Sequence, residues 1–384
     1  MKKVIAVTGI RSEYFILQPV LEELMKRDDC QLKVVVTGAH LSPVHGNTCE
    51  FVENNGYETI KLETLLSSDS LSGRSKSLGI QIMGLTDIVD REKPDWLLVL
   101  GDREESIATA IVGTYMNIPV VHISGGDKVV GNIDDSVRHA VTKLAHLHFP
   151  ATEESGQRIL KMGEESWRVN VVGEPSLDSI RKQPDLSYEY LSEKLEFDLV
   201  ENEPFILLIK HPLSSEVNEA EKQMRATLEA VSELKIKTVV INPNSDAGGF
   251  EIIKVIKEFE SKCNFIKSFK TLPRDIFVNL QRKASLLLGN SSSGITEAPF
   301  LKLPVVNVGN RQKQREHSEN VIFVTHDKNE IKAAINKAIY DDEFIRICKN
   351  CYNPYGDGYS GERIARIIAE TYVDVKLINK EIVY

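Results

Sequence analysis

A chain of 384 residues is too long for one ordinary hydrophobic core, and its length predicts two or three domains. With 42% hydrophobic and 27% charged residues, its composition is that of a soluble globular protein. The formal net charge of −9 argues against a nucleic-acid partner held by phosphate neutralisation. An anionic ligand would need local Arg and Lys side chains and helix N-termini.

The first apolar run follows Lys3, is only about five residues long and ends in a turn, so it predicts a buried strand and not a signal peptide. No stretch approaches the roughly 20 apolar residues of a membrane span. We therefore expect a cytoplasmic protein with no membrane partner. The five Cys residues show no zinc-site spacing, and we expect neither a metal nor a cofactor.

Apolar runs and amphipathic helical patterns alternate along the first half of the chain. The runs cover residues 4–7, 32–36, 96–100 and 120–123, and the last helical pattern extends from Asp134 to Leu147. Because these strands are continuously apolar, they predict a parallel sheet covered by helices on both faces.

Charged and polar residues gather where these strands end. Ligands of parallel sheets bind at the carboxyl ends of the strands, so this edge is the expected binding site. The residues concerned are Arg11, Asp102, Arg103, His122 and Asp127.

The stretch 173–204, rich in charge and Pro, predicts a domain boundary, after which the alternation restarts with strands at 205–209, 239–241, 286–288 and 305–308. The predicted fold class is α/β, with two doubly wound Rossmann-like domains facing a central cleft. We assign 1–175 to the first domain, 176–361 to the second, and 362–384 to a helix that packs back on the first.

Residues 289–297 are the most informative segment, because a strand leads into a loop of small hydroxyl residues that opens a helix. Helix N–H groups and the hydroxyls of Ser291 and Ser292 would form a phosphate cradle. An ordinary Ser N-cap is the alternative. Glu297 falls in the expected first helical turn, where it would compensate the helix dipole or accept hydrogen bonds from ribose hydroxyls.

Three further residues at strand ends suit a diphosphate. Arg11 and Arg311 can bind phosphate oxygens bidentately, although a lone surface Arg is usually just solvated. His211 is held extended by the Pro that follows it, and can bond a phosphate or protonate a leaving group.

The candidate acid/base groups are Asp102, Asp127 and Asp134. Asp134 begins a helix four residues before Arg138, which is therefore available to pair with it. Taken singly, each acid is more often a helix cap than a catalyst. Three acids converging on one site would separate in pKa and supply one proton donor and one base.

With these segments the chain resembles the hydrolysing UDP-N-acetylglucosamine 2-epimerases, which include enzymes of sialic acid biosynthesis. The matching segments are Thr-Gly-Ile-Arg-Ser-Glu-Tyr (8–14), Gly-Asp-Arg (101–103), Gly-Gly-Asp (125–127), the helix 133–146, His-Pro (211–212), Gly-Asn-Ser-Ser-Ser-Gly (289–294) and Asn-Arg-Gln (310–312). They cover nearly the whole chain in order. The resemblance implies the two-Rossmann-domain architecture called GT-B.

The resemblance implies elimination of UDP to a 2-acetamidoglucal, then hydration to free N-acetylmannosamine. Asp102 and Asp134 would be the acid/base groups, and His211 would lie at the leaving diphosphate. The implied partners are a UDP-sugar substrate and UDP, without a metal, in a homodimer or homotetramer. The UDP ligands would be Arg11, Asn244, Ser291, Ser292, Glu297 and Arg311.

Three positions depart from the family pattern. Phe15 stands where the resemblance leads us to expect a small polar residue near the nucleotide. Ser124 and Asp127 stand where related enzymes often carry Glu, and Ser124 cannot act as a carboxylate base. Either Asp127 or Asp102 takes that role, or the substrate is a UDP-2,4-diacetamido-trideoxyhexose of legionaminic acid synthesis. A non-hydrolysing epimerase, a glycosyltransferase and a UDP-sugar-binding protein of the same fold are the remaining alternatives.

Overall fold

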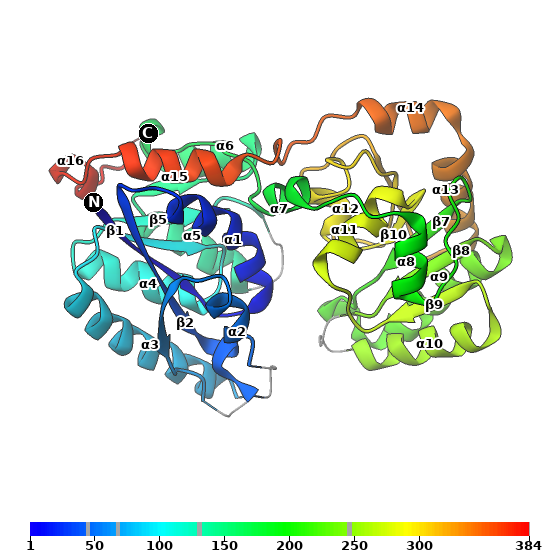
Figure 1. The fold of residues 1–384 in the computed structure, drawn as a ribbon, viewed down its shortest axis with the longest axis horizontal. Coiled ribbons are helices and arrows are strands. Elements are labelled where there is room, and N and C mark those ends of the chain that lie inside the picture. The colour runs from blue at the N-terminus through cyan, green and yellow to red at the C-terminus, as the bar shows by residue number, and fades with distance from the viewer. Residues whose placement is uncertain (44–46, 67–69, 129–132, 244–247, 384) are drawn as a thin grey trace. The chain divides into compact units, whose positions relative to one another are not determined.

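The computed structural model describes residues 1–43, 47–66, 70–128, 133–243 and 248–383. The chain forms two compact units, one made of Met1–Arg181 with Pro354–Tyr384 and the other of Lys182–Asn353 (Figure 1). The chain therefore passes between units after 181 and 353, where the sequence suggested 175 and 361. None of the helices in the described segments is long and apolar enough to cross a membrane.

The first unit is built on a six-stranded sheet with the order β3-β2-β1-β4-β5-β6, in which every neighbouring pair is parallel. Its central strands are continuous apolar runs with both faces buried, as the sequence predicted. The strands are β1 (Lys2–Thr8), β2 (Cys30–Thr37), β3 (Glu58–Leu62), β4 (Trp96–Leu100), β5 (Val120–Ile123) and β6 (Leu147–Phe149).

Helices cover both faces of this sheet and close a hydrophobic core on each side. The helices are α1 (Arg11–Met25), α2 (Cys49–Glu53), α3 (Leu71–Glu92), α4 (Glu104–Tyr115), α5 (Ile133–Leu144), α6 (Glu153–Lys161) and α7 (Ser176–Lys182), followed late in the chain by α15 (Ser360–Glu370) and α16 (Val375–Ile378).

The second unit repeats the plan with a parallel sheet of order β12-β11-β10-β7-β8-β9. Its strands are β7 (Phe205–Ile209), β8 (Lys237–Ile241), β9 (Ile266–Phe269), β10 (Leu286–Gly289), β11 (Val305–Val308) and β12 (Val321–Val324). Its helices are α8 (Tyr188–Leu195), α9 (Ala220–Leu234), α10 (Gly249–Lys262), α11 (Arg274–Lys283), α12 (Ser293–Thr296), α13 (Lys328–Tyr340) and α14 (Asp342–Asn350).

Both sheets reverse their strand order at one central place, between β1 and β4 in the first unit and between β7 and β10 in the second. The loops after these strands diverge to opposite sides, which opens a crevice where open α/β sheets bind ligands. Each unit is thus a doubly wound Rossmann-like fold whose binding edge is fixed by its own topology.

Helix α15 returns the end of the chain to the first unit. Ile364 and Ile368 join the same core cluster as Leu17 and Leu21 of α1 (Figure 1). The carboxylate of Asp178 accepts the N–H groups of residues 360 and 361 at 2.9 and 2.8 Å, which satisfies backbone donors in the first turn of α15.

The four strands that the sequence did not predict are the edges of the two sheets: β3, β6, β9 and β12. Edge strands pair on one side only, and three of these four, β3, β9 and β12, contain half-buried or exposed positions. Polar residues interrupt β3, β6 and β9, whereas β12 is an apolar run that the prediction did not mark. The predicted helix 134–147 was also wrong at its end, because α5 stops at Leu144 and Leu147 begins β6.

Candidate active site

The turn after β1 packs closely on two buried carboxylates. The N–H of Gly9 donates to Glu13 Oε2 at 3.2 Å, and a Cβ on Gly9 would overlap the carboxylate of Glu105. Only glycine fits at this position, because the α4 side chain occupies the space. Arg11 follows this turn as the first residue of α1 and is exposed. Arg11, the predicted phosphate-binding arginine, therefore lies where the sheet reverses its strand order, which we call the switch point. Its side chain is accessible there.

Glu13 and Glu105 were not singled out in the sequence, and both are buried. Burial, followed by the negative charge of Glu105, raises the pKa of Glu13 to about 8. Burial also raises the pKa of Glu105, whose Oε2 lies 3.3 Å from Arg103 Nε. Glu13, Glu105 and the guanidinium of Arg103 therefore lie next to the turn that precedes Arg11.

Arg138 of α5 joins two of the predicted catalytic acids. Its Nη2 forms an ion pair with Asp102 Oδ2 after β4, and its Nη1 lies 3.4 Å from Asp127 Oδ2 after β5. Arg138 is buried, whereas each carboxylate keeps about a fifth of its side chain exposed, at 20% and 23%. The arrangement offers two charged acceptors to a ligand while their negative charge is partly neutralised.

Asp134 lies one turn before Arg138 on the same helix. Burial, followed by the negative charge of Asp102, raises the pKa of Asp134 above its ordinary value. The shift is in the direction that a proton donor needs, while the predicted separation of the three acids stays a prediction. Arg138, which the sequence suggested as a partner for Asp134, contacts Asp102 and Asp127.

Ser124, which stands where related enzymes carry Glu, has a left-handed backbone with φ of 54°. Its Oγ donates to Glu174 Oε2 at 3.2 Å, across 50 residues of sequence. A carboxylate therefore lies beside the serine, although it comes from the Gly-Glu-Pro segment that the sequence marked only as a boundary. The nearby His122 is buried and its pKa falls to about 3, first because of burial, so its ring is neutral.

Asn290 organises the switch point of the second unit. Its side chain accepts the N–H of His211 at 2.7 Å and donates to the His211 carbonyl at 2.9 Å. The Asn290 carbonyl accepts Arg311 Nη1 and Gln312 Nε2, both at 3.1 Å. The structure thus brings His211 and Arg311, 100 residues apart in the chain by their numbers, to one residue that the sequence did not single out.

The serine loop differs from its prediction in the helix that follows it. Helix α12 covers only Ser293–Thr296, so it supplies a single turn and a small dipole. Ser291 Oγ accepts from Ser293 Oγ at 2.9 Å, while Ser292 is exposed. A cradle at this loop would depend on hydroxyl and backbone donors more than on a helix dipole.

Glu297 lies at the C-cap of α12 and not in its first turn, which corrects the expected dipole role. It is buried, and Arg274 Nη2 lies 2.9 Å from its Oε1. Within the described parts of the chain its Oε2 has no hydrogen-bond partner. A buried acceptor of this kind is suited to a ligand hydroxyl.

Asn244, the remaining predicted UDP ligand, lies outside the described residues. Among the residues that are described, no group of three His, Cys, Asp or Glu side chains is placed to hold a metal ion. Cys348 and Cys351 are buried free thiols, and burial raises the pKa of Cys348 to about 12, which disfavours a reactive thiolate.

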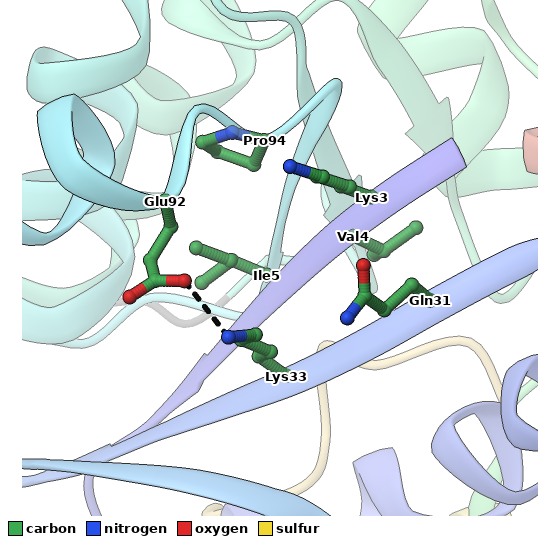
Figure 2. Close-up of a pocket in the computed structure, with 7 residues that line it drawn as sticks. All are labelled: Lys3, Val4, Ile5, Gln31, Lys33, Glu92 and Pro94. Atoms are coloured by element: carbon green, nitrogen blue, oxygen red, sulfur yellow. Dashed lines mark hydrogen bonds and ion pairs between the residues drawn. The ribbon is translucent and has the colours of Figure 1, made fainter. Parts of the chain in front are cut away.

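A small cavity near the beginning of β1 lies away from these strand ends. Lys3, Ile5 and Pro94 line it together with the ion pair between Lys33 Nζ and Glu92 Oε2, 2.8 Å apart (Figure 2). Its walls come from the first residues of β1 and β2 and from the end of α3, which is the amino edge of the sheet. The cavity is therefore separate from the switch point.

Two doubly wound units with acids at one switch point and a serine loop at the other define a nucleotide-sugar enzyme of the GT-B type. The family described as UDP-N-acetylglucosamine 2-epimerase matches residues 22–369. A hydrolysing UDP-N,N'-diacetylbacillosamine 2-epimerase of Legionella pneumophila is 35% identical over 381 residues, 99% of each chain. A Campylobacter jejuni relative named GDP/UDP-N,N'-diacetylbacillosamine 2-epimerase (hydrolyzing) is 33% identical over 84% of each chain.

The fold agrees with solved structures. A UDP-GlcNAc 2-epimerase from Neisseria meningitidis, bound to UDP-GlcNAc, superposes with a TM-score of 0.74 and 22% identity, covering 96% of this chain and all of that one. The chain belongs to the hydrolysing UDP-N-acetylglucosamine 2-epimerase family.

Proposed function

We propose that this protein is a hydrolysing 2-epimerase that acts on a UDP-linked 2,4-diacetamido-trideoxyhexose and releases UDP and the free 2-epimerised sugar. The observation that carries the reaction is the pairing of Arg138 with Asp102 and Asp127, beside the protonation-prone Asp134. The substrate follows from the relatives at 35% and 33% identity, whose names specify diacetylbacillosamine.

The first step removes the C2 proton and expels UDP from C1, which leaves a C1–C2 double bond. Asp102 or Asp127, both in contact with Arg138, accepts the proton. In the second step water adds its hydroxyl to C1 while C2 receives a proton on the opposite face. In this proposal Asp134 supplies that proton, since burial moves its pKa upward.

The second unit holds the nucleotide in this proposal. Ser291, Ser292 and Arg311 of that unit bind the diphosphate, and His211 assists its departure. Arg11, which belongs to the first unit, is a further proposed diphosphate ligand. Glu297 accepts the ribose hydroxyls through its unpartnered oxygen. Asn244 is a further proposed UDP ligand.

Product analysis by NMR in D₂O tests the proposal. The UDP-diacetamido sugar should give free UDP and a free sugar with deuterium at C2, faster than UDP-GlcNAc is turned over. If only UDP-GlcNAc is turned over, the substrate is the one that the family description names and the product is N-acetylmannosamine. A product still linked to UDP would indicate a non-hydrolysing epimerase.

A matched pair of variants separates catalysis from mere binding. Asp102→Asn should lower turnover by about 10²-fold or more while UDP still binds. Asp95→Asn changes an acid at the opposite end of β4, where it accepts the N–H of Lys3 at 2.7 Å, and should keep turnover. Equal and negligible turnover in all three proteins, with UDP bound, would support a UDP-sugar-binding protein instead.

A further inference from the structure

Lys210 directly follows β7 and is buried, with 2% of its surface exposed. Its Nζ donates to the carbonyl of Gln223 and to Thr227 Oγ1 of α9, each at 2.8 Å. It also lies 3.3 Å from Nδ1 of His326, which follows β12. The amine therefore has hydrogen-bond partners, but all three are neutral groups.

No carboxylate in the described segments lies within ion-pair distance of Lys210, unlike Lys380 of the first unit, which pairs with Glu164 at 2.7 Å. The nearest opposing charge that acts on it is that of Glu216, whose Oε2 is 3.9 Å from His326 Nε2. Burial outweighs this charge and lowers the pKa of Lys210 to about 7. A buried ammonium without a counter-ion is costly, so the neutral amine competes.

Lys210 also lies at the switch point. Ile209 pairs with Gly289 in the sheet register, so Lys210 stands opposite Asn290, and His211 is clamped by the Asn290 side chain. On the next strand, a Cβ at Gly309 would lie 2.6 Å from Nε2 of His326. Lys210 and its partner His326 thus contact the strand ends that carry His211 and Arg311.

We propose that the buried amine of Lys210, which has only neutral hydrogen-bond partners, takes up a proton when the diphosphate of a uridine nucleotide binds at this edge. The inference rests on the proposed function, because it requires a diphosphate at the second switch point. A diphosphate brings the negative charge that the buried amine lacks, and a nearby opposite charge favours the ammonium form. Binding and protonation of Lys210 are then thermodynamically linked.

Among the residues that the structure describes, Glu216 and His326 are the titratable groups that act on Lys210, and His211 follows it in the chain. His326 has its pKa lowered to about 4, first by burial and then by Lys210, so it is neutral in the same pH range. A proton taken up at pH 8 therefore resides on Lys210 unless His211 or His326 accepts it, and variants can distinguish these three positions.

Calorimetric titration of the full-length protein with UDP provides the test. At pH 8.0 the binding enthalpy should vary linearly with the ionisation enthalpy of the buffer, with a slope that corresponds to net proton uptake per UDP. At pH 7.0 the uptake should be smaller, because a larger fraction of Lys210 is then protonated before binding.

Lys210→Met should abolish most of this uptake and weaken UDP binding by about tenfold. Lys222→Met is the matched control, since Lys222 lies on α9 with 85% of its side chain exposed, and uptake should persist there. His326→Gln and His211→Gln should also retain the uptake. Uptake that persists undiminished in Lys210→Met, or disappears in either histidine variant alone, would overturn the inference.

The wild-type measurement remains decisive even if Lys210→Met does not fold. Binding of UDP with the same enthalpy in all buffers would refute the role of Lys210 and leave the proposed function standing. Failure of UDP to bind at all would overturn both.

Discussion

Arg138 in helix α5 forms an ion pair with Asp102, which follows strand β4 and lies 36 residues earlier in the chain. The same guanidinium reaches Asp127 after β5 at 3.4 Å. One buried cation therefore fixes acids from two adjacent strand ends, and its helix also carries Asp134. The proposed chemistry depends on this cation, because it holds two carboxylates close together and offsets their mutual repulsion.

Arg138→Met should lower kcat by about 10²- to 10³-fold, because the two acids lose their shared cation. UDP affinity should change little if the second unit holds the nucleotide. Arg91→Met is the control, since its side chain is 61% exposed and pairs with the adjacent Glu92. Steady-state kinetics with thermal melting of each variant provide the measurement. A kcat within twofold of wild type, in a folded Arg138→Met, would remove Arg138 from the mechanism.

Glu297→Gln should weaken UDP binding by about 10- to 100-fold, because a hydrogen bond to a charged acceptor is worth about 1.5–3 kcal/mol. The carboxylate has one oxygen on Arg274 at 2.9 Å and one without a partner in the described structure. Calorimetry with UDP and with 2′-deoxy-UDP would show whether the ribose is contacted. Glu319→Gln, an exposed change, should bind like wild type. Equal losses for both nucleotides in Glu297→Gln would argue against a contact with the 2′-hydroxyl.

In the Glu13→Gln variant, stability should decrease less than in the wild type as pH rises into the alkaline range. The pKa of Glu13 is raised to about 8 in the folded protein from an ordinary value of 4.5, so its folded form binds the extra proton. Its stabilising contribution is therefore complete below 4.5 and is lost as pH rises through about 8. Melting temperatures between pH 5 and 9 should fall more steeply for wild type than for Glu13→Gln. Parallel curves would contradict a protonated Glu13.

Glu164→Gln should destabilise the first unit by about 1–3 kcal/mol, because it removes the charge that compensates the partly buried Lys143 and Lys380. The fully buried Glu164 carboxylate contacts Lys143 Nζ and Lys380 Nζ, each at 2.7 Å, and His148 Nε2 at 3.1 Å. Lys380 in turn donates to the Lys143 carbonyl at 2.9 Å, so the cluster ties the end of the chain to α5.

The stability that Glu164 contributes changes with pH in the opposite direction to that of Glu13. The hydrogen bonds from His148, Lys143 and Lys380 outweigh burial, the largest single influence, and lower the pKa of Glu164 to about 2. Its contribution is present above pH 4.5 and is lost as pH falls towards 2. Chemical denaturation should show wild type losing stability over that acid range and Glu164→Gln losing less. Glu154→Gln, whose side chain is 55% exposed, should behave like wild type. A loss below 1 kcal/mol in Glu164→Gln would contradict the prediction.

The eight central strands were predictable because each is mainly a run of apolar residues, a property that the sequence shows directly. The edge strands β3, β6 and β9 were missed because pairing on one side permits polar residues that interrupt an apolar run. The edge strand β12 was missed although its four residues are all apolar. The end of α5 was misplaced for a related reason: Leu147 is apolar whether it continues a helical stripe or begins a strand.

Most of the predicted site residues were chosen because they lie just after predicted strands, which is a local pattern in the sequence. Arg138 was noticed but assigned to Asp134, its neighbour one helical turn away. Glu105 was not singled out, because a buried Glu and an exposed Glu look alike in sequence. Glu13 and Asn290 lie within the matching segments 8–14 and 289–294, but their contacts with Gly9 and His211 exist only in the folded chain.

The sequence by itself determined the alternation of strands and helices, the two-unit plan and the family, since these depend on local hydrophobic pattern and on motifs in order. Only the tertiary structure decided which charges meet: Arg138 with Asp102 and Asp127, and Lys210 with neutral partners alone. The physical reason is that solvation and charge pairing depend on groups brought from distant parts of the chain, and these set the proton affinity of a side chain.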